Sequence, residues 1–411
     1  MMAVSDAKRS GGLVYDPSAS EIVSDPYPVL LALQRDDPAH WSPAVKAWIL
    51  TRYDDVKRSL AAPSMSVNRI KPFYDSLPPD DRATLAEFMR YLTLWLVFRD
   101  PPEHTRLRQL MAKAFTMRAV ENLRPAVQEA VETLADRLPR GTEFDFVNDF
   151  AMQLPAIVIM DLLGVPREQM FHLKSCSDRM QLFIGSARNA PDKYARAAEG
   201  AHEMATLFRE LIAQRRAEPR EDLISAFIAA RDDDDTLSED ELIAACMLVM
   251  FGGHETTTNL LAGGMAKFIA NPDAAQALAA DPGLARGAVE ECLRLDGPSG
   301  SMARVVAEKH QIHGKTLAPG ERVFAMLNAA NMDPAVFDDP QRFDITRSPN
   351  KHLTFGYGPH FCMGAALARL EGEVAFPELV RRFPGLRLAG DIDWHATIIM
   401  RGPRVMPVRI D

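Results

Sequence analysis

The apolar residues of this chain recur mostly every three or four positions, which is the spacing of amphipathic helices. The helices predicted from this spacing cover residues 29–33, 53–61, 105–137, 149–163, 167–185, 198–216, 221–231 and 365–379. Segments 63–81 and 185–192 are interrupted by Pro, Asp or Gly and are expected to be loops. Residues 1–20 are expected to form a loosely ordered N-terminal extension.

Strand-like patterns are confined to short segments. Residues 48–51 form one of them, and two more, 303–306 and 321–326, lie around a Pro319-Gly320 turn. Residues 397–408 are also expected to be extended. Because no internal repeat and no clean linker interrupts the pattern, we expect a mainly α fold with a minor β portion, in a single domain over residues 1–411.

The longest helical pattern begins with a capping box at Ser238 and Glu241 and continues to Asn271. Roughly 33 residues at about 1.5 Å each would span about 50 Å, enough to cross the domain. Its middle, Gly252–Asn259, holds two glycines and three threonines, and each glycine costs about 1 kcal/mol relative to alanine in a helix. Such a conflict with propensity is expected where function overrides stability, and a glycine here would let a flat cofactor approach the backbone.

Composition and charge exclude several classes of protein. The chain is 47% hydrophobic and 25% charged, as in ordinary globular proteins, and its formal net charge of −9 argues against general nucleic-acid binding. The four cysteines, Cys176, Cys246, Cys292 and Cys362, are widely spaced, so a reducing cytoplasm is expected rather than a disulfide framework. No signal peptide or membrane anchor is expected, because the apolar runs are too short. The run Asp232–Asp235 could hold a metal, but a solvated turn is favoured.

The most informative segment is Phe355-Gly356-Tyr357-Gly358-Pro359-His360-Phe361-Cys362-Met363-Gly364. Its glycines allow sharp turns and close backbone approach around one thiol. Backbone N–H groups directed at the sulfur favour the thiolate, which is the form that binds metal. A lone cysteine is more often a small buried apolar residue, but this arrangement of glycines, proline and aromatic residues indicates a ligand.

This pattern closely resembles the haem-binding loop of the cytochrome P-450 family. The resemblance implies the cytochrome P-450 fold, with a long central helix on the distal side of haem b, and Cys362 as the axial ligand to its iron. It also implies that Phe355, Gly356, His360 and Gly364 contribute to the cofactor-binding loop. The chain resembles the soluble bacterial members in particular.

The polar centre of the long helix resembles the distal motif of the same family. There, an acid and an alcohol deliver protons to dioxygen, and the resemblance assigns these catalytic roles to Glu255 and Thr256. A sealed pocket needs such a relay, because cleavage of the O–O bond consumes protons. A kinked helix with a surface Glu is the alternative. His254, between the glycines and the acid, is expected to be a core residue and not a second iron ligand.

Two further constellations support the resemblance. Glu291 and Arg294 share a helix face, and the family pattern implies a structural ion-pair network with Arg342 in the Pro340–Phe343 segment. His104 and Arg108 lie four residues apart on another predicted helix. The resemblance assigns these two residues, with Arg304 and His360, to the haem propionates, whose carboxylates need cationic partners. A solvated basic face is the alternative for His104 and Arg108.

The partners follow from what the sequence does not contain. Nothing resembles a flavin- or iron–sulfur-binding segment, so the two electrons that a haem-thiolate monooxygenase needs must come from another protein. We expect an acidic ferredoxin, itself reduced by a ferredoxin reductase, to dock at Lys113, Arg118 and Arg106.

The substrate is expected to be a hydrophobic small molecule that is hydroxylated or epoxidised with O2. The residues expected to line the substrate pocket are Leu248, Val249, Gly252, Ser301, Met302, Ile398 and Ile399, with parts of 94–98 and 182–186. A peroxide-driven or isomerising enzyme on the same fold is one alternative, and a non-enzymatic haem sensor or carrier is another. Glu255 and Thr256 count against the first, and the lack of spare length for a signalling domain counts against the second.

Overall fold

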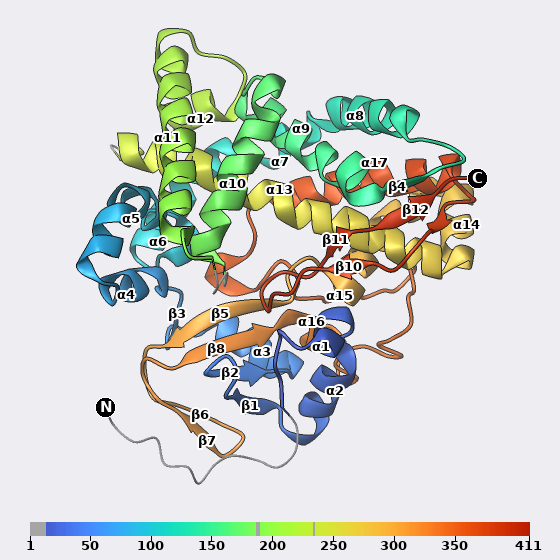
Figure 1. The fold of residues 1–411 in the computed structure, drawn as a ribbon, viewed down its shortest axis with the longest axis horizontal. Coiled ribbons are helices and arrows are strands. Elements are labelled where there is room, and N and C mark those ends of the chain that lie inside the picture. The colour runs from blue at the N-terminus through green and yellow to red at the C-terminus, as the bar shows by residue number, and fades with distance from the viewer. Residues whose placement is uncertain (1–13, 186–189, 233–234) are drawn as a thin grey trace.

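The structure, a computed structural model, describes residues 14–185, 190–232 and 235–411. A large helical part lies beside a smaller part that contains the main sheet, as Figure 1 shows. The helices up to the middle of the chain are α1 (Ser20–Ser24), α2 (Tyr27–Asp36), α3 (Tyr53–Ala61), α4 (Ile70–Asp75), α5 (Pro79–Leu92), α6 (Glu103–Ala114), α7 (Met117–Glu121), α8 (Arg124–Arg137) and α9 (Gln153–Leu163). The predicted mainly α fold is confirmed.

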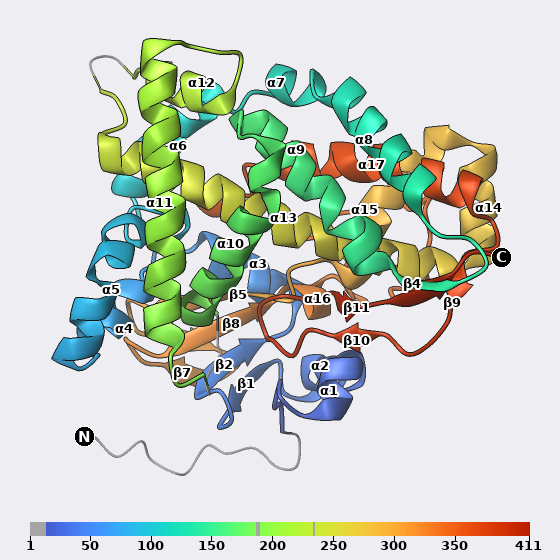
Figure 2. The ribbon, with the colours of Figure 1, turned by 45° about the horizontal axis from the view of Figure 1, so that its top comes forward.

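The second half of the chain supplies the longest helices. They are α10 (Met170–Ile184), α11 (Lys193–Ala217), α12 (Leu223–Ala229), α13 (Glu239–Ala270), α14 (Pro272–Ala280), α15 (Ala285–Asp296), α16 (Leu327–Ala330) and α17 (Ala365–Arg382). Single turns of tighter or wider helix occur at Leu96–Phe98, Val147–Ala151, Arg167–Gln169, Pro282–Leu284 and Gly358–His360. Figure 2 shows α10 and α11 running side by side across α13.

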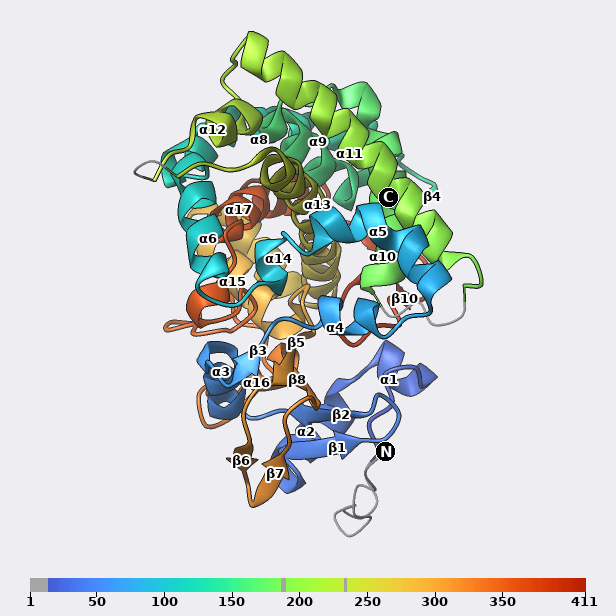
Figure 3. The ribbon, with the colours of Figure 1, turned by 90° about the vertical axis from the view of Figure 1, so that its left-hand side faces the viewer.

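Helix α13 forms the centre of the helical part. It begins at the predicted capping box, in which the Ser238 side chain accepts a hydrogen bond from the Glu241 backbone N–H and Glu241 accepts one from the Ser238 N–H. Its 32 residues are buried on several sides, because α5, α9, α11, α15 and α17 all pack against it. Figure 3, in which α13 is viewed nearly end-on, shows helices surrounding it and the sheet beyond.

Within the part of the chain that the structure describes, the strands form one five-stranded sheet and three small ones. They are β1 (Ala39–Ser42), β2 (Ala47–Leu50), β3 (Met65–Ser66), β4 (Glu143–Asp145), β5 (Ser301–Val306), β6 (His310–Ile312), β7 (Lys315–Leu317), β8 (Arg322–Met326), β9 (Arg387–Leu388), β10 (Asp393–Trp394), β11 (Pro403–Val405) and β12 (Pro407–Arg409). The large sheet has the order β1-β2-β8-β5-β3, with β2 and β8 parallel and the other pairs antiparallel. The predicted turn at Gly320, where φ is 87°, precedes β8.

Two predictions near the N-terminus are wrong in part. The segment 63–81 was expected to be a loop but contains α4 and the start of α5, where Pro79 occupies a first-turn position that proline tolerates. Of the predicted extension, residues 1–13 lie outside the described residues. Tyr15, however, is buried, and its carbonyl oxygen accepts a 2.7 Å hydrogen bond from Ser42 Oγ, so packing against the β1 region orders it.

Candidate functional site

The loop that carries Cys362 is closed by its own backbone. The Cys362 N–H donates to the Phe355 carbonyl oxygen at 2.9 Å, and the Gly356 N–H donates to the Leu353 carbonyl oxygen at 2.7 Å. Gly356 and Gly358 have φ values of 76° and 77°, in the left-handed region that favours glycine. The glycines of the pattern are therefore required by the shape of the loop.

Opposing influences act on the Cys362 thiol. The residue is exposed, yet burial by surrounding protein is the largest influence on the thiol and raises its pKa. Hydrogen bonds from the Gly364 and Ala365 N–H groups, with the positive charges of Arg108 and Arg369, act in the opposite direction and stabilise the thiolate. The predicted N–H donors are present, and a bound metal cation would add to them in favouring the thiolate.

The four predicted propionate residues gather at one side of this loop. His104 on α6 and His360 in the loop have ring centroids 4.0 Å apart. Arg108 donates to the Phe361 carbonyl oxygen at 2.7 Å, and Arg304 on β5 is buried. Burial lowers the pKa of both histidines, that of His360 to about 3, so their rings are neutral near pH 7.

The polar stretch of α13 presents different residues to different neighbours. A Cβ on Gly252 would meet nothing within 4 Å, whereas a Cβ on Gly253 would lie 2.4 Å from Ile159 Cδ1 of α9. Gly252 therefore faces open space, and Gly253 allows two helices to pack closely. His254 is buried, and its pKa falls to about 4 because of that burial.

A cavity of about 270 Å³ lies between α13, the 95–98 segment, the end of α10 and strand β5. Glu255 and Thr256 both line it. The Thr256 hydroxyl donates to the Gly252 carbonyl oxygen at 2.8 Å, and burial raises the pKa of Glu255. Of the predicted pocket residues, those that line the cavity are Leu248, Gly252, Ser301, Met302 and Ile399.

Some of the remaining residues predicted for the pocket line the cavity, and others do not. Trp95, Val97, Phe98, Ile184 and Gly185 line the cavity, as expected from segments 94–98 and 182–186, although Ser186 lies outside the described residues. Val249 and Ile398 are not among the described residues that line this cavity. Ile398 is buried next to a smaller pocket, and its carbonyl oxygen accepts a 2.7 Å hydrogen bond from Ser301 Oγ.

The donor set fits a haem group. A cysteine thiolate is one of the side chains that can bind haem iron, and the Gly364 and Ala365 N–H groups donate toward the Cys362 sulfur. Both ring nitrogens of His104 and the Nδ1 of His360 are buried without a hydrogen-bond partner among the described residues. Buried polar groups are normally paired, and the carboxylates of haem would supply acceptors for such donors and for the nearby arginines.

Comparison with known proteins decides the family. Residues 73–281 and 283–386 match the Cytochrome P450 family. The chain belongs to the cytochrome P450 family. It is therefore a haem-thiolate monooxygenase that carries haem b, takes electrons from a redox partner and uses O2 to oxidise hydrophobic substrates.

Individual relatives resemble this cytochrome P450 along most of its length. Cytochrome P450 107B1 of Saccharopolyspora erythraea is 40% identical over 88% of this chain and 89% of its own. Vitamin D(3) 25-hydroxylase of Pseudonocardia autotrophica is 37% identical over 93% of each chain. The crystal structure of P450BioI in complex with a hexadec-9Z-enoic acid ligated acyl carrier protein superimposes with a TM-score of 0.87 at 33% identity, over 95% of this chain and 99% of that one.

The buried ion-pair network of this cytochrome P450 differs from the prediction in one member. Glu291 and Arg294 are fully buried and joined by two hydrogen bonds of 2.8 and 2.7 Å. The third guanidinium comes from Arg347, whose Nε lies 3.2 Å from Glu291 Oε1. Arg342 was predicted instead, but it contributes its backbone carbonyl oxygen, which accepts from Arg294 and Arg347, while the residue itself is exposed.

The predicted basic docking residues are largely used within the protein. Arg106 is bonded to Asp235 and Glu241, each at 2.6 Å, and Lys113 lies 2.6 Å from Asp232. The acidic run is thus not free in solution: its two described members pair with α6. Arg118 has no ion pair among the residues that the structure describes.

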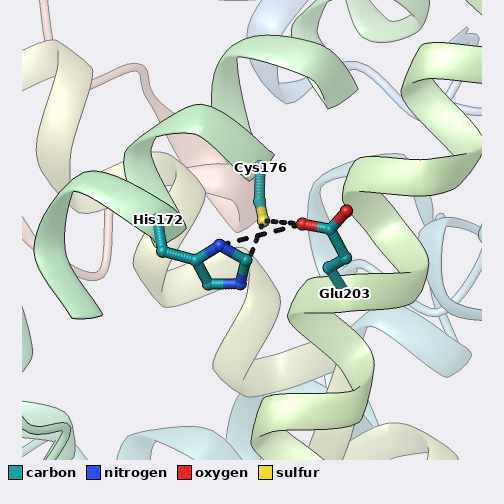
Figure 4. Close-up of side chains that lie close together, drawn as sticks. All are labelled: His172, Cys176 and Glu203. Carbon is teal, nitrogen blue, oxygen red and sulfur yellow. Dashed lines mark hydrogen bonds and ion pairs between the residues drawn. The ribbon is translucent and has the colours of Figure 1, made fainter.

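One other group of metal-binding side chains lies away from the cavity. Figure 4 shows His172 and Cys176 of α10 facing Glu203 of α11, with their ligand atoms within 4.8 Å of one another. Arg179 already binds this carboxylate, at 2.5 Å, and burial raises the pKa of Cys176 to about 11, which keeps it a thiol. The arrangement is that of an ion-paired contact that joins the two helices.

The residues that sequence reasoning missed come from outside the recognised motifs. They are Val67, Arg69, Gln181, Phe251, Ala303, Thr397 and Met400, all of which line the cavity. Segment 63–81 had the pattern of a loop, so nothing in its spacing identified Val67 or Arg69. Phe251 could have been predicted from the sequence, because it directly precedes Gly252 in the long helix.

No membrane-spanning candidate occurs among the helices of the described residues.

Proposed function

We propose that Cys362 is the axial thiolate of the haem and that Glu255 and Thr256 carry protons to the reaction site of this monooxygenase. The observation that supports the relay is that both residues line the same cavity as Arg304 and His360. When bound, haem supplies the activation of O2 with two electrons and the transfer of one oxygen atom to the substrate. The chain's own residues hold the group, exclude water and deliver protons.

The relay rests on two properties of the pair. Burial raises the pKa of Glu255, so this carboxyl takes up a proton more readily than an exposed one and can pass it on. The Thr256 hydroxyl donates to a carbonyl of its own helix at 2.8 Å, which leaves its oxygen free to accept a hydrogen bond from the cavity side. A hydroxyl held in this way can receive a proton while it donates another.

The haem-holding residues have divided roles. We assign Arg108 and Arg304 to the two propionates as cations, and His104 and His360 as neutral N–H donors, because burial lowers the pKa of both rings. Phe355 is buried and stacked under the Arg369 guanidinium at 4.5 Å, which holds the start of the loop. Gly356 provides a turn of the loop, and the Gly364 N–H donates toward the sulfur.

We further propose that the electron donor is a ferredoxin, reduced by a ferredoxin reductase, and that the reaction takes place in the cytoplasm. Arg118 has no ion pair among the described residues, and the Lys57 ammonium, beside the cysteine loop, lies 4.6 Å from the Tyr357 ring. Exposed Met117, Tyr357 and Phe361 give this side apolar contact area as well. An acidic iron–sulfur protein matches this combination of charge and apolar surface.

Turnover with different oxidants tests the reaction. Product should form with O2 and an electron source, and it should form poorly with hydrogen peroxide alone. Equal turnover with peroxide alone would favour a peroxygenase instead. Ferredoxin docking is tested by stopped-flow reduction: Arg118→Glu and Lys57→Glu should slow it and weaken its salt dependence, whereas Arg196→Glu, on α11, should not. Reduction rates that do not change with salt or in either variant would exclude the surface around Arg118 and Lys57 as the docking site.

Substrate class is supported by the cavity walls. Trp95, Phe98, Leu248, Phe251 and Met302 make the cavity predominantly apolar, which suits a hydrophobic small molecule. The named relatives include hydroxylases of 6-deoxyerythronolide B and of vitamin D(3), both large hydrophobic substrates. A cavity of this kind selects for shape and hydrophobicity but leaves the reacting carbon to be set by polar contacts.

A further inference from the structure

The cavity contains a positive charge that the assigned roles do not use. Arg69, at the start of α4, lines the cavity, and its guanidinium carbon lies 4.6 Å from the centre of the Phe98 ring, which lines it too. This stacking holds the guanidinium against one aromatic wall. Because the planar edge of a guanidinium keeps its five N–H donors when its face is stacked, those donors remain available to a ligand.

Within the described ranges, no acidic residue offsets the charge of Arg69. Among the described residues Arg69 makes no side-chain hydrogen bond or ion pair, and the one acid among the described cavity-lining residues is Glu255. Burial raises the pKa of Glu255, which favours its neutral form. Burial, with repulsion from Arg304 as a smaller cause, also lowers the pKa of Arg69 to about 10, so the guanidinium stays charged at neutral pH without a counter-ion. Arg69 is half-buried, and a partly desolvated charge without a partner is costly unless a ligand neutralises it.

The haem carboxylates do not require Arg69. Haem has two propionates, and Arg108 and Arg304 already supply one guanidinium for each, with His104 and His360 as additional donors. Arg304 also has the carboxylate of Asp100 close enough to favour its charged form, whereas the same is not true of Arg69. If Arg108 and Arg304 pair with the two propionates, Arg69 is left without a carboxylate partner. Apolar residues such as Trp95 and Leu248 line the rest of the cavity.

We propose that Arg69 binds the carboxylate of an amphiphilic substrate whose remaining part is a hydrophobic chain or ring system held by the apolar walls. This inference rests on the proposed function, because it names the substrate class of the same site. Arg69 is then a specificity residue: it fixes one end of the substrate and thereby sets which carbon lies near Glu255 and Thr256. A bidentate guanidinium–carboxylate pair in a predominantly apolar cavity gives both affinity and orientation.

Ligand pairs that differ only in the terminal group test this proposal. The ferric holoprotein is titrated with decanoate and with 1-decanol, and with the corresponding pairs from eight to sixteen carbons, while binding is followed by the spin-state change of the haem and by calorimetry. The wild-type protein should bind the carboxylate roughly 10- to 100-fold more tightly than the alcohol of equal length, as expected for a charge-assisted hydrogen bond. Arg69→Gln should abolish this preference with little effect on the alcohol, and Arg69→Lys should keep part of it.

The controls separate the competing explanations. Arg196→Gln removes an arginine on α11 that does not line the cavity and should leave the preference unchanged. If Arg69→Gln weakens both ligands equally and the haem is lost on gel filtration, Arg69 serves the propionates and the proposal is overturned. It is also overturned if no wild-type pair favours the carboxylate. Since binding is measured without electrons, these outcomes are independent of whether the O2-dependent turnover test succeeds.

Discussion

His104 and His360, from opposite ends of the chain, lie with their ring centroids 4.0 Å apart. One comes from α6 and the other from the cysteine loop, so their contact joins the two segments that the sequence motifs had marked separately. Both rings have lowered pKa values, because burial and nearby arginines disfavour a further positive charge. Two neutral rings with unpaired nitrogens beside two arginines form a site prepared for carboxylates.

The thiolate assignment predicts a spectroscopic change. Cys362→Ser should remove the red-shifted Soret band that reduced thiolate-ligated haem shows with carbon monoxide, because the serine oxygen is a weaker donor than the sulfur. The matched control is Cys176→Ser, which replaces a thiol between α10 and α11 and away from the cavity. Retention of the band in Cys362→Ser would exclude this residue as the ligand.

The proton relay predicts uncoupling in one threonine variant but not in its neighbour. Thr256→Ala should divert electrons from product to hydrogen peroxide and lower product formation by roughly 10²-fold, at the lower end of what a positioned proton donor contributes. Thr258 makes the same kind of bond, with its hydroxyl donating to the His254 carbonyl oxygen at 3.0 Å, but it is buried and does not line the cavity. Thr258→Ala should remain coupled, and equal uncoupling of both variants would contradict the relay. Peroxide and product are measured for each NAD(P)H consumed.

The ion-pair network predicts that two nearby arginines differ in importance. Arg347→Ala should lower the free energy of unfolding by about 3 kcal/mol or more, because it leaves the fully buried Glu291 with one fewer cation. Arg342→Ala should change it by less than about 0.5 kcal/mol, since its side chain is exposed and its carbonyl oxygen is kept. Urea unfolding of the holoproteins measures both free energies. Equal losses in the two variants would show that the Arg342 side chain also stabilises the network.

The two glycines of α13 should respond oppositely to alanine. Gly253→Ala places a Cβ 2.4 Å from Ile159 Cδ1. Such overpacking costs roughly 1–3 kcal/mol, so the melting temperature of this variant should fall. Gly252→Ala meets no atom within 4 Å and should keep or raise stability, while its methyl group enters the cavity and changes ligand affinity. Thermal unfolding and ligand titration together distinguish the two, and a stable Gly253→Ala protein would contradict the packing.

Acid should weaken the interaction of the Glu290 carboxylate with His352 and Arg369. Burial alone would raise the pKa of Glu290, but bonds from His352 at 3.0 Å and Arg369 at 2.5 Å outweigh it and lower the pKa to about 2. The resulting stability, up to about 3 kcal/mol, is present above the ordinary glutamate pKa near 4.5 and is lost as the pH falls toward 2. Glu290→Gln should flatten the dependence of unfolding free energy on pH over this range. An unchanged slope would assign acid sensitivity to other groups.

The local features of the site could be predicted because their causes lie within a few residues. The capping box at Ser238 and the turn glycines of the cysteine loop each depend on neighbouring positions, and the structure contains both. The spacing of Glu291 and Arg294 likewise fixed one face of a helix. Backbone geometry and helical periodicity are local properties, so the sequence expresses them directly.

Tertiary packing alone decided which distant partners meet. Arg347 and not Arg342 reaches Glu291, acidic residues after α12 neutralise Arg106 and Lys113, and Arg69 stacks on Phe98 inside the cavity. Each of these contacts joins segments whose relative position depends on how whole helices and strands pack. Spacing along the chain carries no such information, because a side chain's partner is chosen by burial and charge in three dimensions. The sequence by itself determined the cofactor and the reaction. Only the folded structure decided that the Arg69 guanidinium lines the cavity without an ion-pair partner among the described residues.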